Sequence, residues 1–360
     1  MIESARALIT HNTDPFHNLA LEEAITCRLP PGQAVLLLWQ NARAVVIGAG
    51  QNAWRECHAA LLESEGGKLA RRSTGGGAVY HDLGNLNFSI IVPRPDYDLD
   101  RQFSIISSAV SALGFKAERT GRNDLTIGGR KFSGNAFRMY KHAALHHGTI
   151  LVDTDFDMMA RYLNVSPEKL KSKGVKSAPS RVLNLREQKP VTLDSVRAAL
   201  LDAFCAAYAR AETEEVSDEE FPELPGLIKK YADWQWVYGA SPAGAIDLET
   251  RFPWGGIQII ANVKNGRAES VSVYTDAMDE TLSARLSTAL RGAVWKGDEL
   301  MRCAEQVGEK EVGEWLRGAV ASQTLALIER IENGTADMAG PFKTFEEFKA
   351  WMESDDEDEI

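Results

Sequence analysis

The sequence predicts an α+β fold in which short strands and helices are mixed. Short apolar runs typical of strands recur along the chain, and stretches with helical spacing stand between them. The two kinds of segment do not alternate regularly, as they would in a doubly wound parallel sheet. The chain has 360 residues, which favours two domains, one of them large.

Apolar spacing, helix caps and turn residues place the expected elements in order. Helices are expected over residues 19–28 (with Asn18 as the cap), 56–63, 103–113 and 192–209. Strands are expected over residues 35–39, 44–47, 68–73, 78–80, 86–92, 125–127, 130–132 and 148–152. Gly128-Gly129 suits a two-residue hairpin turn, which would mount Lys131 rigidly at the start of a strand.

The last third of the chain predicts a second, smaller domain. Residues 239–244 have the composition of a linker. Strands over 257–263 and 268–274 flank Asn265-Gly266, a strong hairpin signal, and helices over 280–290 and 312–331 follow. We therefore expect a catalytic domain over residues 1–243, an accessory domain over 244–334 and an acidic tail over 335–360. Aromatic spacing in the tail predicts a short helix that either packs on the protein or binds a partner.

Charge and composition exclude several classes of protein. The formal net charge of −11 argues against a general nucleic-acid binder. No apolar run is long enough to span a bilayer, and the first residues lack the pattern of a signal peptide. The four cysteines are scattered and form no CxxC pair, which disfavours a zinc ribbon or a disulfide framework. We expect a cytoplasmic monomer that binds neither nucleic acid nor membrane.

The densest motif is the run RRSTGGGAVYHDLGN over residues 71–85. Glycines let a ligand approach the backbone closely, and successive N–H groups form a concave nest for anions. Arg71 and Arg72 add planar, bidentate donors. The run therefore predicts a site for a phosphorylated or carboxylated ligand, with a tight hairpin and solvated arginines as the alternative. It is not a P-loop, because the terminal Gly-Lys-Ser/Thr is missing.

A second polar cluster spans residues 121–135 and contains Asp124 and Lys131. A lysine beside glycines suits ATP-dependent acyl activation, where it stabilises charge on a carboxylate and an α-phosphate, and the aspartate would hold the accompanying Mg²⁺. Residues 48–53 match the dinucleotide-binding fingerprint weakly, so a turn is favoured over a dehydrogenase site. His146 and His147 are adjacent on a strand, so they would point to opposite faces and would not chelate a metal together.

With both clusters in view, the chain resembles the lipoate–protein ligase A family over about residues 5 to 330. The matching segments are residues 14–16, 18–20, 38–41, 71–85, 121–124, 130–134, 146–149, 234–236 and 252–256. The resemblance implies a catalytic domain of the biotin/lipoate-ligase type and a small C-terminal domain. It implies that lipoate and ATP give lipoyl-adenylate and pyrophosphate, and that a lysine of an acceptor domain then receives the lipoyl group. The implied acceptors are apo lipoyl domains of 2-oxoacid dehydrogenase E2 and the glycine cleavage H protein, with octanoate left open as a second acyl substrate.

The resemblance also implies roles for individual residues, with Lys131 as the catalytic residue. The residues implied to bind ATP are Arg72, Gly77, Ala78, Val79, Tyr80, Asn85, Asp124 and Lys131, with Asp124 also the candidate ligand of Mg²⁺. The residues implied to bind lipoate are Arg72, Ser73, Gly75, Gly76, His81, Lys131, His147 and Gly148.

One departure from the family leaves alternatives open. Ala49 stands where the family usually has arginine, which removes a cation near the expected ligand site. An inactive lipoate-binding homologue is one alternative, and an ATP-independent octanoyl or lipoyl transferase is another. The transferase is disfavoured because no cysteine lies between Cys57 and Cys205, where a thiol nucleophile would be expected.

Overall fold

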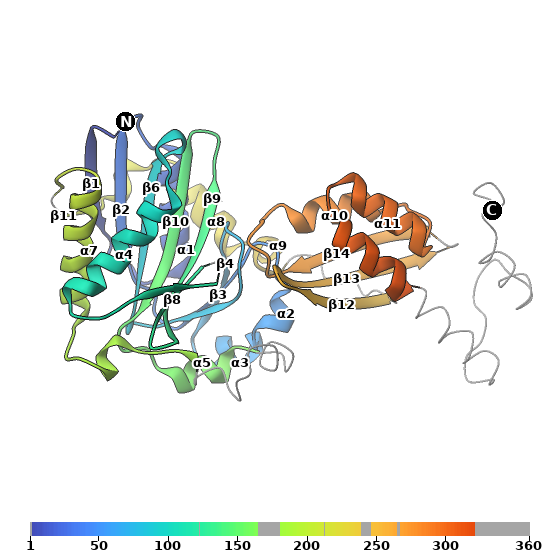
Figure 1. Cartoon of the computed structure of the whole chain (residues 1–360), viewed down its shortest axis with the longest axis horizontal. Helices are drawn as coiled ribbons and strands as arrows, with labels where there is room; N and C mark the ends of the chain where they lie inside the picture. Colours follow the sequence, from blue (N-terminus) through green and yellow to red (C-terminus); the bar gives the residue numbers. More distant parts are fainter. Residues whose placement is uncertain are drawn as a thin grey trace, which may run out of the picture. The chain divides into compact units, whose positions relative to one another are not determined.

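The computed structural model describes residues 2–121, 123–164, 181–211, 213–238, 246–264 and 267–320 (Figure 1). The chain divides into two compact units, one within residues 1–239 plus 278–280 and the other within 240–277 and 281–360. Strands and helices are mixed in both units, which confirms the predicted α+β class.

An eight-stranded mixed sheet forms the frame of the first unit, with strand order β11-β1-β2-β6-β10-β9-β8-β7. β1 pairs in parallel with both β2 and β11, and the remaining neighbours are antiparallel. The strands are β1 (Ser4–Ile9), β2 (Gln33–Trp39), β6 (Asn85–Pro93), β7 (Glu118–Thr120), β8 (Asp124–Ile127), β9 (Arg130–Met139), β10 (Ala143–Leu151) and β11 (Thr213–Glu215).

Helices cover both faces of this sheet, which explains why the apolar run of β2 is buried throughout. Leu36 and Leu38 face a core that includes residues of α4 (Leu99–Ala112) and α7 (Leu193–Ala207), which lie side by side in Figure 1. Leu37 alternates to the opposite face, where α1 (Pro15–Cys27) and α8 (Leu224–Ala232) pack together.

A smaller sheet in the same unit carries the glycine-rich run. Its order is β4-β3-β5, with β4 (Lys68–Arg71), β3 (Ala44–Ile47) and β5 (Val79–His81). The strands on either side of the glycines therefore do not pair with each other, because β3 lies between them. The remaining elements of this unit are α2 (Ala53–Glu56), α3 (Ala59–Ser64), α5 (Phe156–Tyr162), α9 (Trp234–Tyr238) and the 3₁₀ turns η1 (Arg94–Asp96), η3 (Leu185–Glu187) and η4 (Asp218–Glu220).

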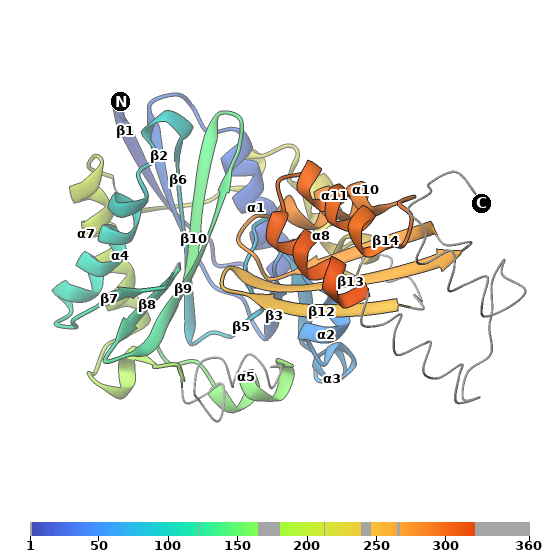
Figure 2. The same cartoon turned by 45° about the vertical axis from the view of Figure 1, so that its right-hand side comes forward.

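The second unit is an antiparallel three-stranded sheet with helices on one face, as Figure 2 shows. It contains β12 (Ile246–Phe252), β13 (Gly255–Lys264), β14 (Arg267–Thr275), α10 (Leu282–Leu290) and α11 (Gly297–Gln306), and residues 310–320 are also helical. The strands expected over 257–263 and 268–274 and the helix over 280–290 are confirmed. The linker at 239–244, the Asn265-Gly266 turn, residues 321–331 and the tail at 335–360 lie outside the described residues.

Three expectations for the first unit need correction. Helix α1 begins at Pro15 rather than after Asn18, because the side chain of Asp14 caps it by accepting from the Phe16 N–H. The expected helix over 56–63 is two short helices, and Cys57 between them forms a β-bridge with Leu163. The strand expected over 68–73 ends at Arg71.

The predicted hairpin turn at Gly128-Gly129 is confirmed. Both residues have positive φ, 56° and 78°, as a two-residue turn of this kind requires. The turn joins β8 to β9 and places Lys131 in the β9 ladder directly opposite Thr126.

Candidate functional site

One pocket in the first unit gathers side chains from both sequence clusters. The empty space it encloses, open mouth included, is about 570 Å³. Polar side chains slightly outnumber apolar ones in its lining. The lining residues are Leu19, Trp39, Val46, Arg72, Gly77, Ala78, Val79, His81, Asn87, Asn123, Lys131, Gly134, Asn135, Ala136, His147, Gly148 and Thr149.

The glycine-rich loop crosses the end of β3 on its way from β4 to β5. A Cβ placed on Gly48, the residue after β3, would lie 2.1 Å from the carbonyl oxygen of Gly76, so only glycine allows this approach. The N–H of Ala49 donates to the carbonyl of Thr74 at 2.9 Å. Residues 48–53 therefore form a turn that supports the loop, which favours the turn over a dinucleotide site.

Arg72 is buried inside the loop and supports its backbone. Its guanidinium donates to the carbonyl oxygens of Val46, Gly75 and Gly77 at 2.7–3.1 Å and to the hydroxyl of Thr74 at 3.0 Å. Burial lowers the pKa of Arg72 to about 10, which leaves it charged at neutral pH. The structure thus places the donors of Arg72 on the protein, and its contact with a nucleotide or with lipoate stays a prediction.

Arg71 has a similar environment at the end of β4. Its guanidinium donates to the carbonyl oxygens of Gly48, Ala49 and Gln51 on one side, and to those of Trp236 and Val237 in α9 on the other. The two arginines that suggested an anion site therefore hold the loop, the Gly48 turn and α9 together.

Lys131 is the other cation in the pocket lining, and its environment differs. Its Nζ lies 2.7 Å from Oδ1 of Asp124, and its side chain is 31% exposed. The pairing follows from the β8–β9 hairpin, in which both residues are mounted on neighbouring strands. An ammonium group has three donors, so this pair can be rearranged when another oxygen approaches.

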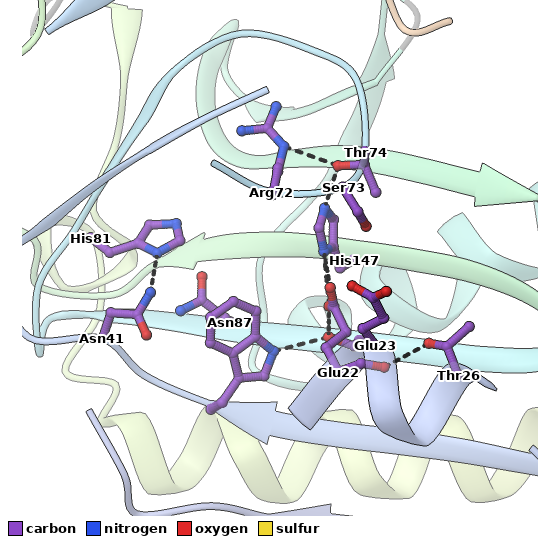
Figure 3. Close-up of polar contacts among 12 residues, drawn as sticks. Glu22, Glu23, Thr26, Asn41, Arg72, Ser73, Thr74, His81, Asn87 and His147 are labelled. Atoms are coloured by element: carbon purple, nitrogen blue, oxygen red, sulfur yellow. Dashed lines mark hydrogen bonds and ion pairs between the residues drawn. The ribbon is translucent and has the colours of Figure 1, made fainter. Parts of the chain in front are cut away.

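A chain of buried polar side chains connects the loop to helix α1 (Figure 3). Nε2 of His147 forms a hydrogen bond with the Thr74 hydroxyl at 2.8 Å, and Nδ1 of the same ring donates to the Glu22 carboxylate at 2.8 Å. Glu22 is 2% exposed, and Ser89 also donates to it. Because buried charges need partners, the chain fixes the orientation of His147 in the pocket wall.

His146 points to the opposite face of β10, as predicted. It is fully buried among Phe88, Phe103 and Phe137 and contacts Asn135 Oδ1 at 2.8 Å. Burial holds the pKa of His146 well below its ordinary value of 6.5, so it is a neutral core residue.

His81 forms another part of the wall, on the outer strand β5. Its Nδ1 lies 3.0 Å from the amide nitrogen of Asn41 (Figure 3). Its ring also makes an edge contact with Trp39, with 6.1 Å between the ring centroids. Burial, with Arg72 and His147 nearby, lowers the pKa of His81 to about 3. This ring is therefore neutral at physiological pH.

Some predicted residues do not reach the pocket lining. Tyr80 alternates to the other face of β5 and packs against Tyr162. Asn85 donates to the side chain of Asn87, which itself lines the pocket. The residues Ser73, Gly75 and Gly76 belong to the loop without lining the pocket.

Sequence reasoning did not select several polar residues at the pocket. Asn87, Asn123, Asn135 and Thr149 line the pocket. Glu22, Asn41 and Thr74 lie behind the lining, where they contact His147 or His81. For Glu22 a signal was present, because a carboxylate after Leu19-Ala20-Leu21 on a buried helix needs a partner.

Two negative findings apply to the described part of the chain. It contains no group of three or more His, Cys, Asp or Glu side chains arranged to hold a metal ion. It also has no helix whose length and apolar character would let it cross a membrane.

Comparisons with protein families match both units. Residues 14–205 match the model of the lipoyl protein ligase A/B catalytic domain. Residues 241–317 match the model of the bacterial lipoate protein ligase C-terminus.

Solved structures agree with these matches. P. falciparum LipL1 in complex with lipoate is 26% identical and covers 87% of this chain and 99% of its own, with a TM-score of 0.77. A bipartite lipoate protein ligase of Thermoplasma acidophilum, studied with its E2 lipoyl domain, is 32% identical and covers 68% of this chain and 100% of its own, with a TM-score of 0.61. A lipoate-protein ligase A bound with ATP is 31% identical, covering 66% and 99%, with a TM-score of 0.58.

Proposed function

Because the chain belongs to the lipoate–protein ligase A family, we propose that it is an ATP-dependent lipoate–protein ligase. In the first step an oxygen of the lipoate carboxylate attacks the α-phosphorus of ATP, the bond to the bridging oxygen breaks, and pyrophosphate leaves. In the second step the ε-amine of an acceptor lysine attacks the acyl carbon, AMP leaves, and a proton passes to solvent. We propose apo lipoyl domains of 2-oxoacid dehydrogenase E2 and H protein as acceptors, and octanoate as a second acyl substrate that competes with lipoate.

The observation that carries this proposal is the environment of Lys131. Of the two cations in the lining, Arg72 has its donors on carbonyl oxygens, whereas Lys131 is half-buried and paired with one carboxylate. Two anionic groups must meet in the first step, and a fixed cation between them lowers the electrostatic cost. We assign that role to Lys131, at the polar wall of a pocket whose apolar side chains suit an acyl chain.

Asp124 is the residue that we propose to contact Mg²⁺ arriving with ATP. Mg²⁺ in ATP sites keeps several waters and binds one or two carboxylates plus phosphate oxygens, so a single carboxylate beside the nucleotide is sufficient. Asp124 is 23% exposed in its side chain and therefore accessible to such a complex. In the absence of nucleotide the same carboxylate holds Lys131 in place.

The pocket argues against a transferase that works through a cysteine thioester. Its lining, as far as the structure describes it, includes no cysteine. Cys57 is 3% exposed within an apolar core, and burial raises the pKa of its thiol to about 12. A thiol nucleophile needs a lowered pKa and access to the substrate. Direct attack by the acceptor lysine on the acyl-adenylate requires no reactive thiol in the pocket.

The test is the intact mass of an apo lipoyl domain after incubation with the protein, Mg²⁺ and lipoate, with and without ATP. We expect the mass of one lipoyl group to be added only with ATP, and lipoate-dependent release of pyrophosphate. Acyl transfer from an octanoyl carrier protein without ATP would instead establish the transferase. Lipoate binding without pyrophosphate release would establish the inactive homologue that Ala49 leaves open.

Lys131→Ala should slow pyrophosphate release roughly 100- to 1,000-fold, as loss of a comparable electrostatic group does in other enzymes. The matched control is Lys141→Ala, since Lys141 is an exposed lysine just beyond the other end of the same strand. A Lys131→Ala variant that forms the adenylate at a near-normal rate would refute the assignment.

A further inference from the structure

A chain of three buried side chains begins at helix α1 and ends at the pocket. The amide nitrogen of Asn18 donates to the backbone carbonyls of Asn12 and Gln40 at 2.8 and 2.9 Å, and to Oδ1 of Asn41 at 3.0 Å. The amide nitrogen of Asn41 in turn lies 3.0 Å from Nδ1 of His81. Asn18 and Asn41 have no exposed surface, and His81 is 3% exposed.

These contacts determine which ring nitrogen of His81 carries the proton. Backbone carbonyls can only accept, so the NH₂ group of Asn18 faces them, and its two hydrogens are shared among three acceptors. An NH₂ group of Asn41 in this position would oppose another donor, so Asn41 presents its oxygen to Asn18. The NH₂ group of Asn41 is then the part that faces His81, and Nδ1 of His81 must accept. A neutral ring that accepts at Nδ1 carries its proton at Nε2.

The resulting donor belongs to a residue of the pocket wall and has no partner among the described residues. Nε2 of His81 is buried and has no hydrogen-bond partner among the residues that the structure describes, and His81 lines the pocket. The amide nitrogen of Asn87, also in the lining, is unpartnered in the same way. Buried donors without partners are costly, and a pair of them in one pocket indicates that an acceptor from a ligand belongs there.

We propose that Asn41, oriented by Asn18, is a positioning residue that holds His81 in the Nε2–H tautomer, so that His81 donates to a carboxylate oxygen of the acyl substrate. This proposal rests on the ligase function proposed above. The carboxylate is the one group of lipoate or octanoate with strong acceptors. A neutral imidazole donor orients that group without adding charge to a pocket that already contains Arg72 and Lys131.

The surroundings of His81 favour the neutral ring that this arrangement requires. Burial lowers its pKa to about 3, and the nearby Arg72 and His147 act in the same direction. The ring has no carboxylate partner among the described residues to stabilise a cation. The ring therefore gains its Nε2–H donor because Asn41 donates to Nδ1, and not because the ring carries two protons.

The test combines a spectroscopic readout with ligand binding. Histidine ¹⁵N chemical shifts report the protonation of each ring nitrogen, and titration calorimetry reports lipoate and ATP affinity separately. In Asn41→Asp a carboxylate faces Nδ1, and because it can only accept, the neutral ring must move its proton from Nε2 to Nδ1. Asn12→Asp is the control, because it makes the same atomic change in an exposed side chain. Only the backbone carbonyl of Asn12 contacts Asn18, and the substitution keeps that carbonyl.

We expect the wild type to show the Nε2–H tautomer. We expect Asn41→Asp to show the Nδ1–H tautomer and to bind lipoate roughly 10- to 100-fold more weakly, with ATP affinity unchanged. If the Asn41→Asp ring instead carries both protons, it keeps the donor, and lipoate affinity should stay near that of the wild type. His81→Gln places an amide donor near the position of Nε2, so adding Asn41→Asp to that variant should cost little.

Three results would overturn the proposal. They are a wild-type ring protonated at Nδ1, an inverted tautomer with unchanged lipoate affinity, and a loss confined to ATP affinity. Failure of the ligase function is seen separately, because it appears in the wild type as absence of lipoate-dependent pyrophosphate release. Failure of the positioning role appears only in the variants of an active wild type.

Discussion

Replacement of Arg72 by lysine tests whether this residue supports the glycine-rich loop or contacts a ligand directly. The substitution keeps the charge and removes the planar fork that reaches Val46, Thr74, Gly75 and Gly77. A lysine ammonium can replace about two of these four contacts, and the other two acceptors remain buried without a donor.

The expected cost follows from these contacts. Each hydrogen bond from a charged donor contributes about 1.5–3 kcal/mol, so the loss of two predicts roughly 3–6 kcal/mol of lost stability. For a unit of this size that corresponds to a fall in Tm of roughly 10 °C. Lipoate binding should weaken as well, because the loop that Arg72 supports forms part of the pocket wall.

Thermal unfolding without ligand, followed by circular dichroism, measures this loss. The control is Arg6→Lys, because Arg6 forms partly exposed ion pairs with Glu214 and Glu220 and should change stability by less than about 1 kcal/mol. An Arg72→Lys variant with an unchanged Tm and a large loss of ATP affinity would refute the support role. It would instead support the predicted role of Arg72 as a direct ligand of the nucleotide.

Further predictions concern other buried groups. The folded-state pKa of His81, about 3, lies below its ordinary value of 6.5. The stability that its neutral ring contributes is therefore complete above pH 6.5 and is lost as the pH falls toward 3. Urea unfolding should show that the free energy of unfolding falls less between pH 7 and pH 5 for His81→Gln than for the wild type. Glu22→Gln removes the charge facing His147 and should cost about 1–3 kcal/mol in the same assay at pH 7; an unchanged midpoint would mean that the pair does not stabilise the fold. Cys57→Ala should leave the rate of lipoyl transfer unchanged in the mass assay, whereas abolished transfer would favour the thioester route.

Features encoded by neighbouring residues were predictable from the sequence. Gly128-Gly129 between two short apolar runs specifies a turn, and the turn specifies the position of Lys131. The opposite orientations of His146 and His147 follow equally from the period of a strand. In each case the physical cause lies within a few residues.

Features that depend on distant residues were not predictable in this way. The order β4-β3-β5 separates the two strands that flank the glycines, and no local pattern specifies that β3 lies between them. Glu22 meets His147 across 125 positions of sequence. The partners of Arg71 and Arg72 were hidden for the same reason, since the carbonyl oxygens that accept from them come largely from β3, the Gly48 turn and α9.

Arg72 and Lys131 differ in burial, and this difference decides which of the two side chains can turn toward the substrate. A ligand could recruit Arg72 only by displacing carbonyl oxygens that would then be buried without donors, at a cost of about 1–3 kcal/mol each. Lys131 has one carboxylate partner and partial contact with water, so its ammonium can turn from Asp124 toward an incoming oxygen at little cost. If Mg²⁺ and ATP approach Asp124, they draw away the partner of Lys131 at the same moment. We therefore expect Asp124→Asn to weaken adenylate formation while leaving lipoate binding largely intact, and a loss of lipoate affinity equal to the loss of rate would contradict this division of roles.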